Sequence, residues 1–96
     1  MKYKTSYLSI AESDIIRIGE ALMDHPGKAK RIFQEIAKKV KDLEEMPYMW
    51  PVYQAKPEYR RMVLEDHLLF YIVDEKEHNV KVYRVLYSKM DIANHI

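Results

Sequence analysis

The fold of this chain is decided by Tyr59-Arg60-Arg61-Met62-Val63-Leu64, His67-Leu68-Leu69-Phe70-Tyr71-Ile72-Val73-Asp74-Glu75 and Val80-Lys81-Val82-Tyr83-Arg84-Val85-Leu86-Tyr87-Ser88-Lys89-Met90-Asp91. Each run is rich in β-branched and aromatic residues, which favour strands. Short charged segments at residues 65–66 and 74–79 separate the runs and suit hairpin turns. The C-terminal third therefore predicts three consecutive antiparallel strands.

A strand and two helices are predicted upstream. Residues 2–8 alternate between aromatic or β-branched and polar side chains, a period typical of a strand. Ser9 and Glu12 have the spacing of a capping box, which predicts a helix from Ser9 to about Asp24. Pro26 suits the first turn of a second helix, which is expected to end near Glu45.

Both predicted helices are amphipathic. The apolar positions of the first helix recur at three- and four-residue steps and predict a stripe that faces a sheet or another helix. These positions are Ile15, Ile16, Ile18, Gly19, Leu22 and Met23. The second stripe comprises Ala29, Ile32, Phe33, Ile36, Val40 and Leu43. The order β-α-α-β-β-β predicts an α+β domain, in which a helical hairpin packs on a twisted antiparallel sheet.

Length and composition limit the class of protein. Ninety-six residues suit one domain over residues 1–96. Sixteen Lys and Arg against fifteen Asp and Glu give a net charge of +1, so RNA binding would need a local basic patch. The chain has no cysteine and its four histidines are scattered, so we expect no metal site and no cofactor. It also lacks a long apolar run, and we expect a cytoplasmic protein without a membrane partner.

The three C-terminal runs, the order of elements and the length resemble the RelE/ParE superfamily, the toxins of bacterial type II toxin–antitoxin modules. In RNA-cleaving members, basic residues hold the phosphate and an aromatic or other proton-transferring residue assists the reaction. If this chain cleaves RNA, the resemblance implies a catalytic set from the positions that match. That set is Arg60, Arg61, Arg84, Tyr87 and Lys89.

Three departures from the RNA-cleaving pattern favour another activity. Leu68 stands where those relatives carry an arginine, Leu86 where some carry a histidine, and Met90 where a second basic residue is common. The resemblance therefore favours a ParE-like toxin that inhibits growth by binding DNA gyrase. The alternatives are a RelE-like, ribosome-dependent mRNA endoribonuclease and a degenerate relative that only binds a partner.

Each of these residues also has a structural role as an alternative to the catalytic one. Arg60 and Arg61 are adjacent on a strand and should point to opposite faces. Arg84 is expected to tie down the sheet by pairing with an acid such as Asp91 or Glu65. Tyr87 has the alternative of a buried ring with a satisfied hydroxyl.

The resemblance also implies a partner. Antitoxins of this class wrap a disordered C-terminal segment around the toxin, and they add a helix to the hairpin or a strand to the sheet edge. We expect a cognate antitoxin to cover the N-terminal strand edge and apolar hairpin residues such as Ile16 or Phe33.

Overall fold

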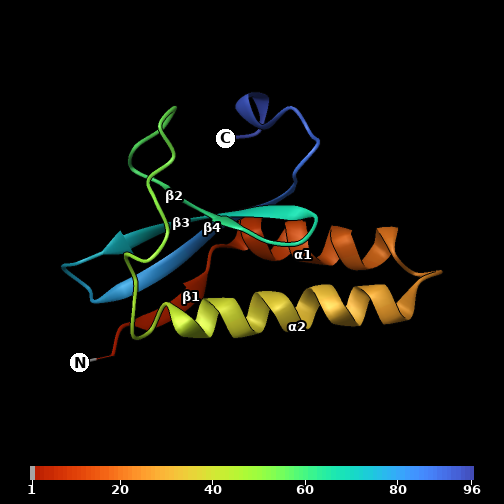
Figure 1. The fold of residues 1–96 in the computed structure, drawn as a ribbon, viewed down its shortest axis with the longest axis horizontal. Helices are drawn as coiled ribbons and strands as arrows, with labels where there is room; N and C mark the ends of the chain where they lie inside the picture. The colour runs from red at the N-terminus through yellow and green to blue at the C-terminus, as the bar shows by residue number, and fades with distance from the viewer. Residues whose placement is uncertain (1) are drawn as a thin grey trace.

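The computed structural model describes residues 2–96, and Met1 of the domain predicted over residues 1–96 lies outside them. A central sheet has two helices on one side, while the loop before β2 and the C-terminal segment rise on the other side (Figure 1). The elements in chain order are β1 (Lys4–Tyr7), α1 (Ser9–Ala21), α2 (Pro26–Asp42), β2 (Arg60–Val63), β3 (His67–Asp74), β4 (Asn79–Tyr87) and a short 3-10 helix, η1 (Ile92–Asn94). This confirms the predicted β-α-α-β-β-β order. Among the described helices, none is long and apolar enough to cross a membrane.

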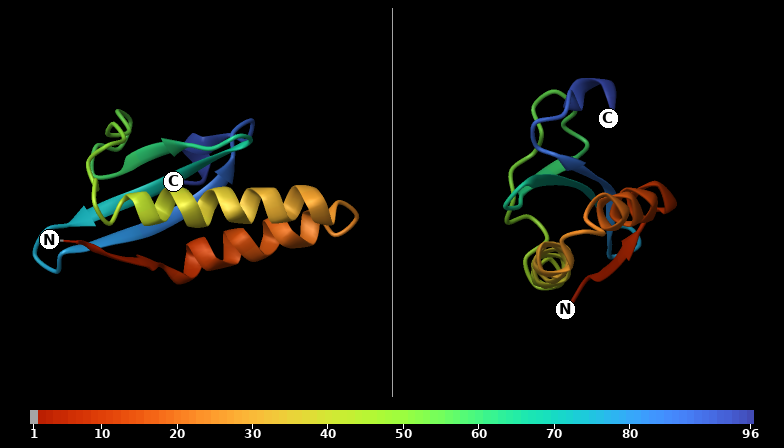
Figure 2. Two further views of the ribbon diagram at one scale, coloured as in Figure 1. Left: turned by 60° about the horizontal axis from the view of Figure 1, so that its bottom comes forward. Right: turned by 90° about the vertical axis from the view of Figure 1, so that its right-hand side faces the viewer.

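The sheet has the order β1-β4-β3-β2. Strands β2, β3 and β4 form the predicted antiparallel meander. Strand β1 pairs with β4 in parallel, from Lys4 opposite Asn79 to Tyr7 opposite Val82, so the sheet is mixed. The helical hairpin carries the chain from β1 to the far edge of the sheet, as the two views in Figure 2 show. The parallel pair follows because the chain enters β1 and β4 from the same end.

An extra residue in β4 changes which side chains face the helices. The register shifts between Phe70 and Tyr71, so that Phe70 lies opposite Arg84 and Tyr71 lies opposite Val82. Val82 and Val85 are three residues apart, yet both belong to the core beneath the helices. In a regular strand they would point to opposite faces, so the bulge at Tyr83 restores the buried face.

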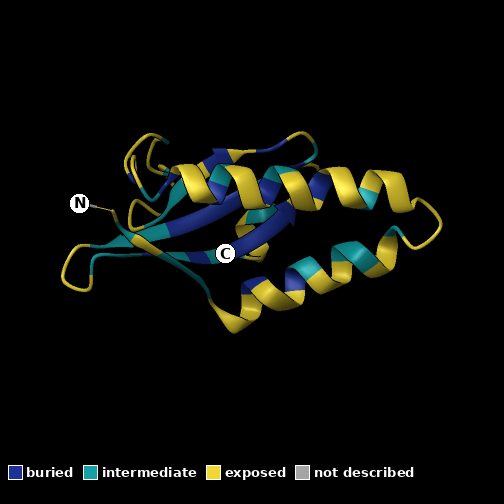
Figure 3. Cartoon of the chain, turned by 90° about the horizontal axis from the view of Figure 1, so that it is seen from below, coloured by how far each residue is buried: buried dark blue, intermediate teal, exposed yellow. Residues whose placement is uncertain are grey.

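The helices contribute unequally to the core. Helix α2 buries Ile32, Ile36 and Val40, as its stripe predicts. Helix α1 buries only Ala11 and Asp14, and Figure 3 shows that most of its surface is exposed. Ile15, Ile18 and Leu22 are half-buried against the core. The prediction of one buried stripe on α1 was wrong for Ile16 and Met23, whose exposed fractions are 63% and 77%.

The predicted capping box at Ser9 is absent. Leu8 is the N-cap of α1, and its carbonyl already accepts the hydrogen bond from the Glu12 amide. Ser9 therefore lies inside the helix, where its hydroxyl does not cap the terminus. The Leu8 amide still donates to the Val82 carbonyl, so strand pairing holds Leu8 in the extended conformation that an N-cap requires.

Residues 46–58 form an ordered loop that contains several aromatic residues. Pro47 is buried, and Trp50 packs against the core. The hydroxyl of the fully buried Tyr71 donates to the Pro47 carbonyl at 2.8 Å. Burial raises the pKa of Tyr71 to about 12. This hydrogen bond fixes the loop over the end of the core.

Candidate functional site

Arg84 is held by a buried ion pair with Asp14 of α1. Its Nε donates to Oδ2 at 2.8 Å and its Nη2 donates to Oδ1 at 3.0 Å, a two-pronged geometry. The Asp14 side chain is 2% exposed and that of Arg84 is 10% exposed. The hydrogen bonds to Asp14 raise the pKa of Arg84 above its ordinary value. Pairing with Asp91 or Glu65 was the expectation, and the actual partner is Asp14.

The position of Asp14 follows from where β1 ends. Strand β1 pairs with β4 only as far as Val82, and α1 then begins beside the rest of β4. The amide of Val85 would lack a strand partner there, and it donates instead to Asp14 Oδ2 at 3.0 Å. One carboxylate thus binds a guanidinium and a backbone amide, which fixes α1 against β4.

Arg60 and Arg61 lie on opposite faces of β2, as predicted. Arg60 is level with the core residue Tyr71, and its Nη1 donates to the Trp50 carbonyl at 2.7 Å. Its guanidinium also lies 4.8 Å from the centre of the Tyr48 ring. Arg61 is exposed, level with Phe70, and its guanidinium lies 5.9 Å from the Tyr53 ring. Arg60 therefore has a role in fixing the loop, and only Arg61 is free on the surface.

Tyr87 and Lys89 do not join Arg84. Tyr87 is at the end of β4, opposite His67, and the register places its side chain on the face of the sheet that the helices cover. Arg84 lies three residues earlier, opposite Phe70, and belongs to the other face. Tyr87 is 45% exposed, so the alternative of a buried ring is wrong. Lys89 is exposed in the turn after β4. The four predicted catalytic residues in strands are thus divided between the two faces of the sheet, and Lys89 lies beyond the end of β4.

The face of the sheet opposite the helices, which we call the outer face, is partly covered by its own chain. Phe70 is fully buried there, with the Tyr53 ring edge-on at 5.1 Å. Two cations hold the C-terminal segment: Arg84 Nη1 donates to the His95 carbonyl, and Lys56 Nζ donates to the Ile96 carbonyl at 2.6 Å. All three guanidinium nitrogens of Arg84 consequently have protein partners.

A cavity of about 330 Å³ lies between α1 and the end of β4. We call it the His67 pocket, and it is lined by Asp14, Arg17, Ile18, Ala21, Leu22, His67, Val85, Leu86, Tyr87 and Met90. His67 is 8% exposed, and its Nδ1 is the one buried side-chain nitrogen or oxygen of residues 2–96 without a hydrogen-bond partner. Burial lowers the pKa of His67 below its ordinary value. The histidine is therefore predominantly neutral near pH 7.

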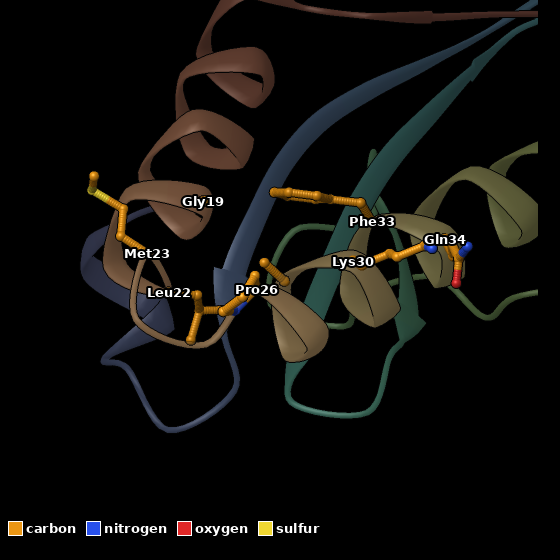
Figure 4. Close-up of a pocket in the computed structure, with 8 residues that line it drawn as sticks. Gly19, Leu22, Met23, Pro26, Lys30, Phe33 and Gln34 are labelled. Atoms are coloured by element: carbon orange, nitrogen blue, oxygen red, sulfur yellow. The ribbon is translucent and has the colours of Figure 1, made fainter.

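A second, larger hollow lies between the two helices. We call it the hairpin groove; it has a volume of about 510 Å³, and its lining includes Gly19, Leu22, Met23, Pro26, Lys30 and Phe33. Phe33 extends from α2 towards Gly19, as Figure 4 shows. Its ring also lines a further cavity of about 190 Å³ beside Tyr7 and Ile15. Apolar hollows thus follow the space between the helices from the hairpin turn towards β1.

The sequence did not single out Asp14 or His67 as site residues. A signal for Asp14 was present, because it follows Ala11 by three residues and precedes Ile18 by four on the apolar stripe of α1. An acid at such a position needs a buried partner. His67 gave no comparable signal. No group of acidic or histidine side chains within residues 2–96 has the arrangement of a metal site.

Comparison with known proteins identifies similar sequences and folds. The family model described as the ParE toxin of type II toxin-antitoxin system, parDE, matches residues 7–92. No curated protein matches the chain significantly. The chain is similar in fold to a protein of the chromosomal ParDE system from P. aeruginosa, with a TM-score of 0.74 and 20% identity over 90% of this chain and 96% of that one.

Two further solved structures have the same fold. A chain of the toxin-antitoxin complex RelBE2 from Mycobacterium tuberculosis matches with a TM-score of 0.71 and 17% identity, covering 91% of this chain and 99% of that one. A mutant of the E. coli toxin RelE in the free state matches with a TM-score of 0.73 and 16% identity, covering 99% of this chain and 93% of that one. At these identities the structural matches establish the fold.

Proposed function

Because the chain belongs to the ParE toxin family of type II toxin–antitoxin systems, we propose that it inhibits growth by binding DNA gyrase, without cleaving RNA, and that a cognate antitoxin neutralises it. The proposal takes its target from the ParE-like resemblance of the sequence. It takes its mechanism, binding instead of hydrolysis, from the geometry of the five candidate residues.

The observation that carries the mechanism is the engagement of Arg84. Stabilising a phosphoryl transition state requires guanidinium or ammonium groups that converge on the phosphate. The three nitrogens of Arg84 are instead bound to Asp14 and to the His95 carbonyl. Arg60 donates to the Trp50 carbonyl, and Tyr87 lies on the other face of the sheet from Arg84. This arrangement supports a protein that acts through its surfaces.

The hairpin groove supports a partner that supplies an amphipathic helix. Met23 and Ile16 on α1 are largely exposed, and Phe33, between the helices, is 36% exposed. An antitoxin helix with apolar residues at three- and four-residue steps would cover these side chains. Acidic residues at the edge of that helix would meet Lys30, which lines the groove. The toxin–antitoxin complex of the M. tuberculosis relative is consistent with such a partner.

The target is tested by inducing the chain alone in bacteria and following labelling of DNA and of protein during the first minutes. We expect DNA synthesis to fail first, and the purified chain to bind purified gyrase and inhibit its supercoiling activity. Prompt loss of protein synthesis with cleavage of ribosome-bound message would favour the RelE-like alternative. Normal growth would favour the degenerate relative, and either result would refute the gyrase proposal.

The antitoxin surface is tested separately with Phe33→Glu. A charge in the hairpin groove should weaken binding of the antitoxin encoded beside the toxin, because the apolar helix would then bury an unpaired carboxylate. Lys38→Glu is the matched control, since Lys38 is exposed on α2 and lines none of the described hollows. Equal affinity of both variants for the antitoxin would show that the helix binds elsewhere.

A further inference from the structure

We propose that the His67 pocket receives one aromatic side chain from the protein that the toxin inhibits, and that an acidic residue beside it pairs with Arg17. This inference rests on the proposed function, because it names the chemistry by which a binding toxin recognises its target. It assigns the pocket to the target and the hairpin groove to the antitoxin.

The size and lining of the pocket suit a single ring system. Its volume of about 330 Å³ lies at the lower end of the range for ligand sites. Ile18, Leu22 and Val85 supply aliphatic walls, and the half-exposed Tyr87 stands at the side. The His67 and Tyr87 rings meet edge-on with their centres 5.9 Å apart. An incoming ring would extend this aromatic pair.

The unpartnered nitrogen of His67 lies behind the wall of the pocket. His67 lines the pocket, but its Nδ1 is buried away from solvent, so a side chain in the pocket does not reach this nitrogen in the structure. The occupant is therefore selected by ring packing against His67, Tyr87 and the aliphatic walls.

The charges around the pocket predict an acidic residue in the partner, next to the aromatic residue that enters the pocket. The charge of Asp14 is already balanced by Arg84 at 2.8 Å. Arg17 approaches Asp14 at only 3.4 Å, and its side chain is 70% exposed. The pocket therefore has one excess positive charge at its mouth, which a carboxylate of the partner complements.

The position of Leu22 links the pocket to neutralisation. Leu22 lines both the His67 pocket and the hairpin groove, which flank the C-terminal end of α1. A helix in the groove would contact the residue that forms one wall of the pocket. Antitoxin binding would therefore disturb the pocket without filling it.

The pocket is tested with Ala21→Trp and Arg17→Glu. Ala21 is exposed and lines the pocket, so an indole at this position should occupy it without burying a new charge. We expect both variants to fold, to bind antitoxin as the parent does, and to lose about tenfold or more in gyrase affinity and in toxicity. Ser13→Trp is the control for bulk, because Ser13 is exposed on α1 outside the pocket. Parental toxicity of Ala21→Trp would overturn the proposal.

A direct measurement uses indole-3-propionate, which combines an indole with a carboxylate. We expect millimolar probe to shift the side-chain nitrogen resonances of His67 in the parent chain and not in Ala21→Trp. A His67 signal that does not move would overturn the assignment of the pocket. If the parent chain neither binds gyrase nor arrests DNA synthesis, the proposed function fails instead. The two failures are thus distinguishable.

Discussion

Asp14 Oδ2 lies 2.8 Å from Arg84 Nε, although the two residues are 70 positions apart in the sequence. The same oxygen accepts from the Val85 amide, so the carboxylate takes the place of a strand partner where β1 has ended. Apart from Asp14, helix α1 buries only Ala11. Its position on the sheet therefore depends on this polar cluster as well as on the half-buried Ile15, Ile18 and Leu22.

Replacing Asp14 by alanine should destabilise the protein strongly. The change leaves the Arg84 guanidinium and the Val85 amide without their partner in a buried site, and removal of one member of such a pair costs about 3–5 kcal/mol. Urea denaturation followed by circular dichroism measures the difference. Asp24→Ala, at an exposed acid in the turn after α1, is the control. A loss below about 1 kcal/mol would show that the cluster does not hold α1.

A double substitution distinguishes the effect of the charges of Asp14 and Arg84 from the effect of the volume that their side chains fill. In Asp14→Leu/Arg84→Met no charge remains buried, and apolar replacement of a buried pair is often neutral or stabilising. We expect the double variant to regain most of the stability lost by Asp14→Ala. A double variant as unstable as the single one would show that the Val85 amide, which still lacks an acceptor, accounts for most of the loss.

Local sequence patterns predicted the order of the elements, and the features that they missed depend on tertiary structure. The runs of β-branched and aromatic residues located β2, β3 and β4, and proline at the start of α2 located that helix. The parallel pairing of β1 with β4 was not predicted, because it depends on how the hairpin crosses the sheet. The bulge at Tyr83 was also missed, since period-two alternation assumes a regular strand.

The Tyr71 hydroxyl gives a second stability prediction. It donates to the Pro47 carbonyl at 2.8 Å from a fully buried side chain. Tyr71→Phe retains the ring and leaves the carbonyl unpaired, so we expect a loss of about 1–3 kcal/mol. Tyr48→Phe is the matched control, because Tyr48 is exposed. Equal thermal midpoints for the two variants would contradict a structural role for the buried hydroxyl.

Gly19 provides a test of how firmly the helices are held together. A Cβ at this position would lie 3.2 Å from Cζ of Phe33, which is close enough to require a small shift of the ring. The ring is at the surface between two hollows and has room to move. Gly19→Ala should therefore show the helix-propensity gain of about 0.5–1 kcal/mol. A lower thermal midpoint would mean that the Phe33 ring is fixed.

The candidate site was less predictable than the fold. The resemblance placed Arg84 and Tyr87 in one catalytic set, and their spacing of three in β4 puts them on opposite faces. The partner of Arg84 was mistaken because Asp91 and Glu65 are near in sequence, whereas Asp14 becomes its neighbour only through the crossing of α1 over β4. Sequence identified Arg84 as important, and tertiary structure decided its role.

The burial of His67 predicts that the folded protein loses stability on mild acidification. Its burial lowers its pKa in the folded state; Lys28 acts in the same direction, while Asp66 and Glu35 oppose it. Between that lowered pKa and the ordinary value of about 6.5, the unfolded chain binds more protons at this residue than the folded chain. The free energy of unfolding should therefore fall as the pH drops through 6.5, by less than about 1.4 kcal/mol per pH unit from this group.

The measurement is urea denaturation of the parent and of His67→Phe between pH 7 and pH 5. Phenylalanine retains a buried ring and does not titrate, so the variant should lose less stability than the parent on acidification. His25→Gln is the control, because His25 is exposed beside the start of α2. Parallel pH profiles for the parent and His67→Phe would mean that His67 gains its proton as readily in the fold as in the unfolded chain.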